Sequence, residues 1–444
     1  MLNKLKSVDE KLSPGLRKII RNIGWLSAER VLSMILSFFV GVYVIRYLGS
    51  ENYGKLSYSI SYVALFIAIS KLGLDQIVVR NLVKQEHSTA EILGTAFILK
   101  LIGSLIALFL IYITIFQSSN DIQIRKTTII IAIGLIFSCF DVLDLWFQSQ
   151  VLSKSTAIVR SSQFVISFIA KLSFIFFKFP LIAFAYLLLF DSIVKAVGMI
   201  IVYSRKNQSI WHWKIRKLSA INLLKDSWPL ILSGVMVTIY MKIDQVMLGN
   251  MSSSQEVGNY AAAVKFSEIW YFIPMAVCSS VFPAIIRAKQ RSRQEYYVKM
   301  QQLYDFMSIL SISVAIPITF TSNSILTNVL GSEYSKAGTI LTLHIWSGVF
   351  IFWGVARGKW LIAENKIGLN FVTQSLGAIT NIVLNLVFIP KYGGMGAAIS
   401  TLISYAVSSY LSCLLFPSLF YTGWMLTKSL LIPFRLKNLV NFAK

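Results

Sequence analysis

Two short stretches of this sequence share one pattern. The stretch LGNMSSSQEVGNYAAAVK runs from Leu248 to Lys265, and YLGSENYG runs from Tyr47 to Gly54. In each stretch Leu-Gly ends an apolar segment, a Glu follows, and Gly and Tyr lie together where the next apolar segment begins. Six apolar segments separate the two copies, so both copies cross in the same direction. The pattern predicts two parallel halves with a pseudo-symmetry axis along a membrane normal.

Long apolar runs surround these stretches on both sides. Each run has about 20 residues or slightly more, which suits a helix that crosses a bilayer and is too long for a strand. The chain of 444 residues is 56% hydrophobic and only 14% charged, so it lacks the charged surface of a soluble protein. The sequence predicts an all-α integral membrane protein with about 12 transmembrane helices in two pseudo-symmetric six-helix bundles. The runs lie at residues 23–47, 54–74, 91–116, 127–150, 156–177, 180–204, 225–249, 257–286, 303–322, 337–361, 368–390 and 394–420.

Polar stretches between the runs predict the domain boundaries. Residues 1–22 carry six basic residues without a short apolar core, so we expect a surface helix and not a cleavable signal peptide. The longest polar stretch separates the halves. The expected parts are a basic cytoplasmic segment at 1–22, an N-terminal bundle at 23–204, a cytoplasmic linker at 205–224, a C-terminal bundle at 225–420 and a basic cytoplasmic tail at 421–444.

The positive charge of the chain favours membrane orientation over nucleic-acid binding. Lys and Arg number 42 against 19 Asp and Glu, which gives a formal net charge of +23. These residues lie in short stretches between apolar runs and not along one soluble face. The basic runs RKNQSIWHWKIRK from Arg205 and RAKQRSRQ from Arg287 fall on one side of the membrane if both termini are cytoplasmic. The positive-inside rule therefore predicts cytoplasmic termini.

The sequence lacks the residues for a disulfide framework, a zinc site or an ATP-binding loop. Cys139, Cys278 and Cys413 each lie inside an apolar stretch, so neither a disulfide framework nor a zinc pattern can be built from them. No phosphate-binding P-loop is present, so direct use of ATP is not expected. The outer loops are short and offer no folded domain for an active site. We therefore expect no enzyme, no metal and no cofactor.

Three longer segments carry a family resemblance. KIDQVMLG from Lys242 continues through EVGNYAAAVK and IPMAVCSSVFPAI to Ile285, RYLGSENYG is followed by LGLDQIVVRNLVK to Lys84, and LNLVFIPKYGGMGAA begins at Leu384. In these segments the chain resembles the polysaccharide-biosynthesis or O-antigen repeat-unit flippases (Wzx-type) of the MATE-like multidrug/oligosaccharidyl-lipid/polysaccharide exporter superfamily. One departure is WFQSQ from Trp146, where family members often place Gly and then an acidic residue after Trp-Phe-Gln.

The resemblance implies a function and leaves alternatives open. It implies transfer of an undecaprenyl-diphosphate-linked oligosaccharide to the outer leaflet of the bacterial inner membrane, by alternating access around a central cavity. Coupling to H+ or Na+ and partners among other polysaccharide-assembly proteins are also implied. One alternative is a MATE-like cation-coupled multidrug exporter, whose cavity should be acidic. The other is a membrane polymerase or ligase, against which the short outer loops argue.

Charged residues inside the apolar runs are the candidates for binding. An ionised side chain at bilayer depth costs at least about 2.5 to 3.5 kcal/mol on insertion scales, so each should face protein or a water-filled cavity. Fixed cations would stabilise a diphosphate in such a cavity. The candidates for a cationic substrate cavity are Arg30, Lys100, Lys195, Lys242 and Lys265. For Lys195 an ion pair with Asp191, four residues earlier, is an equal alternative, and Lys265 can pair in the same way with Glu268.

Acidic residues inside the runs are the candidates for a coupling ion, because close carboxylates bind a proton or sodium ion readily. These candidates are Asp141, Asp144, Asp244 and Glu268. For Asp141 and Asp144 the favoured alternative is pairing with Arg or Lys of neighbouring helices.

Other polar residues in the runs have simpler explanations. The amide stripe Asn370, Gln374, Asn381 and Asn385 predicts hydrogen bonds between helices, with sugar binding as the alternative. Arg357 lies at the cytoplasmic end of its run, where the positive-inside rule already explains it.

Overall fold

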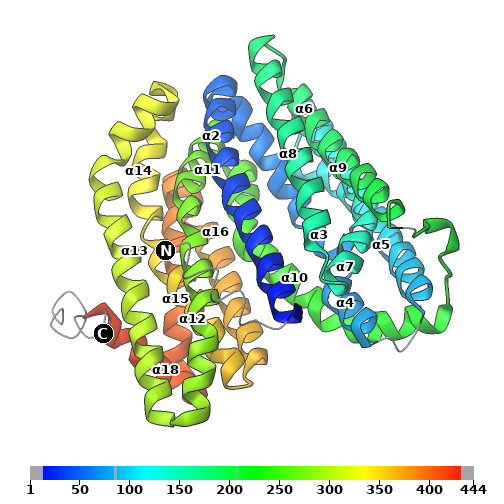
Figure 1. The fold of residues 1–444 in the computed structure, drawn as a ribbon. Coiled ribbons are helices and arrows are strands. Elements are labelled where there is room, and N and C mark those ends of the chain that lie inside the picture. The colour runs from blue at the N-terminus through cyan, green and yellow to red at the C-terminus, as the bar shows by residue number, and fades with distance from the viewer. Residues whose placement is uncertain (1–13, 85–87, 207, 432–444) are drawn as a thin grey trace, which may run out of the picture. The chain divides into compact units, whose positions relative to one another are not determined.

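The computed structural model describes residues 14–84, 88–206 and 208–431, with the side chains of 14–33, 35, 153 and 367 outside that description. In these residues the chain forms helices joined by short connections, and no strand (Figure 1). The elements up to residue 204 are α2 (Pro14–Ala64), α3 (Ile67–Lys71), α4 (Leu74–Lys84), α5 (Thr89–Ser118), α6 (Ile122–Ile133), η1 (Gly134–Phe140), α7 (Asp141–Ser149), α8 (Ser153–Phe176) and α9 (Leu181–Ser204).

The later elements continue the same pattern of long helices with short 3-10 or π-helical turns. They are η2 (Ile210–His212), α10 (Lys217–Met251), α11 (Ser254–Glu268), η3 (Ile269–Tyr271), α12 (Phe272–Arg291), α13 (Arg293–Leu330), η4 (Ser332–Tyr334), α14 (Ser335–His344), α15 (Ser347–Ala363), α16 (Ile367–Ala406), η5 (Val407–Leu411), α17 (Ser412–Leu415), η6 (Pro417–Leu419) and α18 (Phe420–Leu430).

The all-α membrane fold class is confirmed. Among the described residues, nine helical stretches are long and apolar enough to cross a bilayer, and one more pair, α14 with α15, does so across a 45° bend. Two of the nine stretches each join two helices at a glycine with positive φ, Gly49 (φ 72°) in α2 and Gly393 (φ 54°) in α16. Divided at these two glycines, whose backbone conformation favours glycine, the nine stretches and the bent pair give twelve helical segments, which equals the number of spans that the sequence predicts.

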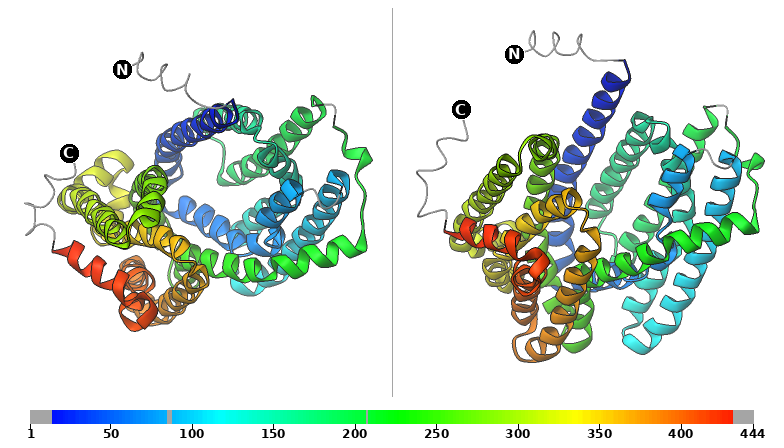
Figure 2. Two further views of the ribbon diagram at one scale, coloured as in Figure 1. Left: turned by 60° about the horizontal axis from the view of Figure 1, so that its bottom comes forward. Right: turned by 90° about the horizontal axis from the view of Figure 1, so that it is seen from below.

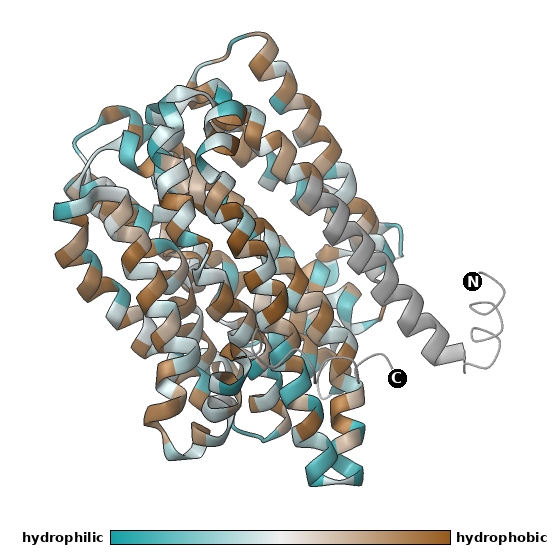
Figure 3. Ribbon diagram, turned by 90° about the vertical axis from the view of Figure 1, so that its left-hand side faces the viewer, coloured by the Kyte–Doolittle hydropathy of each residue, from teal (hydrophilic) through white to brown (hydrophobic). Residues whose placement is uncertain are grey.

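Hydropathy along the helices agrees with this assignment. Figure 3 shows apolar residues along the lengths of the helices and polar residues gathered near helix ends and connections. Serine caps begin three of these helices: the hydroxyls of Ser88, Ser253 and Ser292 each accept a hydrogen bond from the backbone N–H of the Glu three residues later. This S-x-x-E spacing is a sequence signal for a helix start, so these boundaries follow from local chemistry.

The contacts divide the chain into two compact units. Unit 1 comprises Met1–Val44 and Val63–Val235, and unit 2 comprises Ile45–Tyr62 and Met236–Lys444. These bounds differ from the expected bundles at 23–204 and 225–420. Residues 205–224, expected as a linker, belong to unit 1. There the Trp213 ring lies 5.4 Å from that of Phe97, and the backbone N–H of Lys214 donates to the Ala90 carbonyl. Figure 2 shows this connection leading from α9 into the long helix α10.

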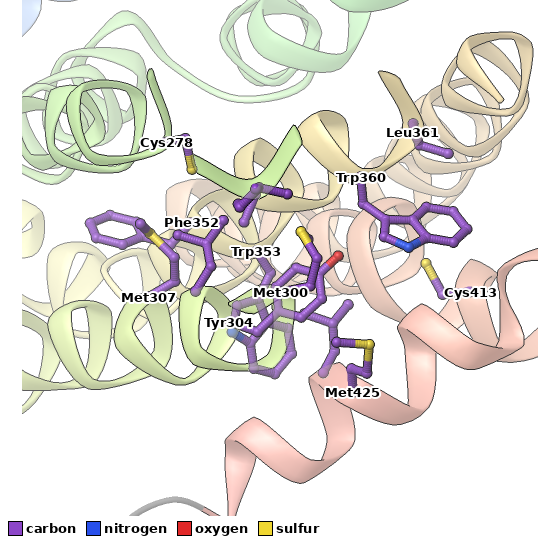
Figure 4. Close-up of a cluster of buried hydrophobic side chains, with 14 of the residues drawn as sticks. Cys278, Met300, Tyr304, Met307, Phe352, Trp353, Trp360, Leu361, Cys413 and Met425 are labelled. Atoms are coloured by element: carbon purple, nitrogen blue, oxygen red, sulfur yellow. The ribbon is translucent and has the colours of Figure 1, made fainter. Parts of the chain in front are cut away.

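Unit 2 has a core of aromatic and sulfur-containing side chains from α12, α13, α15 and α18 (Figure 4). The Trp353 indole N–H donates to Ser308 Oγ at 2.8 Å, and the hydroxyls of Tyr304 and Thr422 hydrogen-bond at 2.6 Å. Met425 is buried in the same core. The expected cytoplasmic tail at 421–444 therefore begins as a packed helix, and its last residues, 432–444, lie outside the described part of the chain.

The two repeated stretches of the sequence meet in unit 2 at a very close helix crossing. A Cβ on Gly54 would lie 1.7 Å from the Ser254 carbonyl oxygen, and a Cβ on Gly258 would lie 1.8 Å from the Ser50 carbonyl oxygen. The two contacts are reciprocal, as a pseudo-twofold relation requires. Only glycine allows backbones to approach this closely, so the glycines of the repeat are explained by the crossing.

Candidate functional site

Most of the charged candidates in unit 1 are held in ion pairs. Lys195 Nζ lies 2.6 Å from Asp141 Oδ1, and Arg160 Nη2 lies 2.6 Å from Asp144 Oδ2. Fully buried Lys100 donates to Asp75 Oδ1 at 2.5 Å. The geometry thus matches the alternative in which Asp141 and Asp144 pair with cations of neighbouring helices. In each pair the two opposite charges compensate each other, so neither side chain offers a full charge to a ligand.

Lys195 contacts Asp141 and not Asp191, the partner that the sequence offered as an equal alternative. The Asp191 carboxylate accepts a hydrogen bond from Ser167 Oγ at 2.8 Å, while Lys195 reaches Asp141 on α7. The i, i+4 spacing on α9 suggested the local pair, but η1 and α7 pack against α9 and bring a second carboxylate within reach. The packing of η1 and α7 against α9 therefore determines which of the two aspartates pairs with Lys195.

Asp75→Asn should destabilise unit 1 because it leaves the Lys100 ammonium buried without a charge partner. We expect a loss of about 2 to 3 kcal/mol, less than for a wholly buried pair because the Asp75 side chain is 40% exposed. Adding Lys100→Met should restore most of the loss in thermal unfolding of the purified protein. Lys71→Met is the matched control. The Lys71 ammonium is 3.7 Å from the same carboxylate, but its side chain is 39% exposed, so this substitution should change the free energy of unfolding little. Equal effects of Lys71→Met and Asp75→Asn would contradict the argument.

Asp244 is an acidic candidate whose hydrogen-bond partners among the described residues are all neutral. It is 3% exposed on α10. Its Oδ2 accepts from Tyr260 OH at 2.9 Å and from Thr401 Oγ1 at 2.7 Å, and its Oδ1 accepts from Asn385 Nδ2 at 2.6 Å. Asn381 Oδ1 accepts a second bond from the same Asn385 amide at 3.0 Å. We call these five side chains the Asp244 cluster.

Two buried polar atoms, one in the Asp244 cluster and one beside it, have no hydrogen-bond partner among the described residues. Asn385 Oδ1 is buried and has no hydrogen-bond partner among the described residues. Nδ1 of His344, whose ring packs edge-on against Tyr260 at 5.9 Å, is likewise buried without a partner there. A buried carboxylate without a cation is costly unless it binds a proton or a metal ion. Carboxylate, amide and hydroxyl oxygens are the ligands of small hard cations.

The remaining candidates are dispersed. Lys242 is half-buried on α10 and makes no hydrogen bond or ion pair with any described residue. Lys265 and Glu268 lie half-buried on α11. Arg30 lies in α2, but its side chain is outside the described part of the structure. A shared cationic cavity formed by Arg30, Lys242 and Lys265 stays a prediction.

Arg357 is more deeply buried than the sequence suggested. It is 2% exposed within α15, although the positive-inside rule suggested an interfacial residue. Its guanidinium donates to the Ser408 carbonyl at 2.6 Å and to Thr373 Oγ1 at 3.0 Å. The available signal was the amide stripe: Asn370 and Gln374 line the hollow beside Arg357, while Asn381 and Asn385 belong to the Asp244 cluster.

Family profiles match most of this architecture. The profile described as polysaccharide biosynthesis protein matches residues 19–289, which is more than half of the chain. The MatE profile matches residues 229–387, a range that holds Asp244 and Arg357.

Curated relatives have related names. One is "Probable low-salt glycan biosynthesis flippase Agl15" of Haloferax volcanii, 26% identical over 50% of this chain and 49% of the relative. Another is the capsular polysaccharide biosynthesis protein CapF of Staphylococcus aureus, 20% identical over 88% of this chain and 97% of the relative. The match to the first relative spans about half of its length.

Solved structures establish the fold. The lipid II flippase MurJ in an inward closed conformation superposes with a TM-score of 0.72 at 16% identity, covering 93% of this chain and 92% of that one. An inward-facing multidrug resistance MATE family transporter superposes with a TM-score of 0.70 at 12% identity, covering 92% and 98%. Agl15 is named as a probable flippase, and the two solved structures are a flippase and a transporter. The chain therefore belongs to the polysaccharide biosynthesis protein family, and it shares its fold with a MATE family transporter and with the lipid II flippase MurJ.

Proposed function

We propose that this protein is a flippase for a lipid-linked oligosaccharide. The substrate would be an undecaprenyl-diphosphate-linked repeat unit of O-antigen or a related polysaccharide, moved from the cytoplasmic to the outer leaflet of a bacterial inner membrane. The observation that carries the proposal is the family match over residues 19–289, on a multi-pass helical fold shared with flippases. The positive-inside charge distribution supports cytoplasmic termini.

The ion pairs narrow the choice of residues that would hold the diphosphate. Lys100 and Lys195 are neutralised by Asp75 and Asp141, so they contribute less than the sequence suggested. Lys242 makes no ion pair with any described residue and is the better candidate, because a diphosphate brings about two negative charges that fixed cations stabilise at low dielectric. Arg30 and Lys265 stay predictions.

The Asp244 cluster is the proposed coupling-ion site. Asp144 and Asp141 already have cationic partners, while Asp244 has only neutral donors. A proton or Na+ bound there would neutralise the carboxylate and change the interactions among α10, α11 and α16. Ion binding that favours one conformation over another is what couples an ion gradient to transport.

Alternating access requires an end of the protein that can close. The crossing of Gly54 with Ser254 and of Gly258 with Ser50 is our candidate for that closing contact. Under the proposed orientation it lies at the outer end, because the chain before Tyr47 starts in the cytoplasm. It would have to part before an oligosaccharide could leave outward.

The decisive experiment follows the substrate in each leaflet. Cells that lack the protein should accumulate undecaprenyl-diphosphate-linked oligosaccharide on the cytoplasmic face and lose surface polysaccharide. Proteoliposomes with the purified chain should expose the same labelled lipid to an impermeant modifying reagent, and empty liposomes should not. Normal delivery to the outer leaflet in cells without any other flippase would contradict the proposal.

A MATE-like exporter of cationic compounds is the second candidate. The MatE match and the acidic, neutral-lined Asp244 cluster favour it. It predicts ion-driven efflux of a fluorescent cationic dye from cells and no effect on leaflet distribution of the lipid-linked sugar. Dye efflux and the leaflet distribution of the lipid-linked sugar, measured together, distinguish a drug exporter from a flippase.

A further inference from the structure

The Arg357 guanidinium is buried in unit 2 among neutral acceptors. Besides Ser408 and Thr373, it donates to Asn370 Oδ1 at 3.4 Å and to Cys413 Sγ at 3.4 Å. Its Nε–H is buried without any acceptor in the described residues. No carboxylate of the described chain lies within ion-pair distance of it.

An uncompensated guanidinium at this position is energetically unusual. Arg stays charged in proteins, and removing such a charge from water costs several kcal/mol unless an opposite charge accompanies it. A basic residue kept only for orientation would extend its side chain to the interface. Arg357 instead points into the protein, so its position calls for an anion.

A cavity of about 250 Å³ adjoins this guanidinium. The π-helical turn η5 supplies Ser408 and Ser409 to its wall. The side chains of Gln374 and Ser409 make no hydrogen bond within the described part of the chain, so they can serve as donors to a ligand. Gly358 leaves open space, because a Cβ built there meets no atom within 4 Å. Other lining residues are Tyr240, Gly354 and Asn370.

We propose that this cavity binds the phosphate of a lipid headgroup, with Arg357 as its charge partner. Guanidinium, amide and hydroxyl donors are the groups that recognise phosphate oxygens. The cavity is smaller than the usual 300 Å³ or more of pockets that enclose a whole ligand, so it suits a headgroup and not an oligosaccharide. Arg357 lies six residues before Ala363, which ends α15, or about 9 Å at 1.5 Å per residue. Under the proposed orientation Arg357 therefore lies within the last two turns of the cytoplasmic end of α15.

The phosphate has two possible carriers. One is the diphosphate of the transported lipid, in which case the inference rests on the proposed function and adds a binding residue to it. The other is an anionic phospholipid of the surrounding membrane, which would regulate the protein. Both present the same oxyanion chemistry to Arg357, so they must be separated by measurement.

The test measures binding of two probes to the purified full chain in detergent by native mass spectrometry: undecaprenyl diphosphate and phosphatidylglycerol. The variants are Arg357→Gln, which removes the charge, and Gly358→Leu, which fills the cavity and keeps Arg357. Lys359→Gln is the charge-matched control, since Lys359 packs over the Phe282 ring outside the cavity. Gly368→Leu is the size-matched control, because a Cβ at Gly368 also meets nothing within 4 Å.

We expect both cavity variants to weaken binding of one probe at least about tenfold, a change of about 1.4 kcal/mol, with both controls unchanged. Loss of undecaprenyl diphosphate identifies the transported lipid as the carrier, and loss of phosphatidylglycerol identifies the membrane. Unchanged binding of both probes to Gly358→Leu would overturn the inference and leave Arg357 as a support for η5. If phosphatidylglycerol binding depends on Arg357 while the wild type flips no oligosaccharide, the proposed function fails and this inference stands.

Discussion

Asp244→Asn should stop ion-coupled transport while leaving the fold as stable as before or slightly more stable. The amide has nearly the shape of the carboxylate, and its oxygen can still accept from Tyr260, Thr401 or Asn385. It removes a charge that has no cation partner among the described residues, so the unfolding free energy should not fall. It also removes the group that holds a proton or Na+. Coupling free energies of this kind are typically about 1 to 3 kcal/mol, so the effect of the ion on substrate affinity, about 5- to 150-fold, should be lost.

The measurement combines transport in proteoliposomes, with imposed H+ or Na+ gradients, and thermal unfolding. Asp144→Asn is the contrasting variant: it leaves Arg160 without its partner and should lower stability. Adding Arg160→Gln to Asp144→Asn should recover that loss. If Asp244→Asn lowers stability as much as Asp144→Asn does, Asp244 is a structural residue. If gradient-driven transport persists in Asp244→Asn, the coupling ion binds elsewhere.

Local signals in the sequence were sufficient for the helices and for one member of the site. The length of the apolar runs predicted the passes, the S-x-x-E spacings explain helix starts, and Asp244 was selected before its neighbours were known. It is one of the four acidic candidates inside the apolar runs, where a charge is costly, and it matches the Asp that precedes the Leu-Gly turn in the family pattern. The amide stripe on α16 was also visible, because side chains three or four residues apart share a helix face.

Partners distant in sequence could not be predicted. Asp141 lies 54 residues before Lys195, and its selection over Asp191 depends on how η1 and α7 pack against α9. Burial of Arg357 depends on the rotation of α15, which the positive-inside rule does not address. The repeated glycines were recognised as a repeat, but nothing in one stretch shows that its backbone touches the other.

Gly54→Ala and Gly258→Ala should each disrupt the crossing in unit 2. Each methyl group would lie within 2 Å of a carbonyl oxygen, so the backbones must separate. Overpacking typically costs about 1 to 3 kcal/mol, which outweighs the gain of about 1 kcal/mol from replacing a helical glycine by alanine. Because both substitutions break one reciprocal contact, the double variant should cost less than the sum of the single variants. Gly348→Ala is the control, since its Cβ would meet Tyr271 at an ordinary 3.8 Å and should be neutral or stabilising.

Cysteine accessibility distinguishes a parted crossing from general unfolding. Ser50 is 3% exposed, so Ser50→Cys should resist an impermeant maleimide in an otherwise wild-type chain. In the Gly258→Ala background it should react, because the methyl group lifts the opposing helix from the Ser50 carbonyl. Native Cys139, buried in unit 1, should stay unreactive in both proteins if the rest of the fold is intact. Protection of Ser50→Cys in both backgrounds would mean that the helices adjust without separating, and the crossing could not then be the contact that opens for outward release.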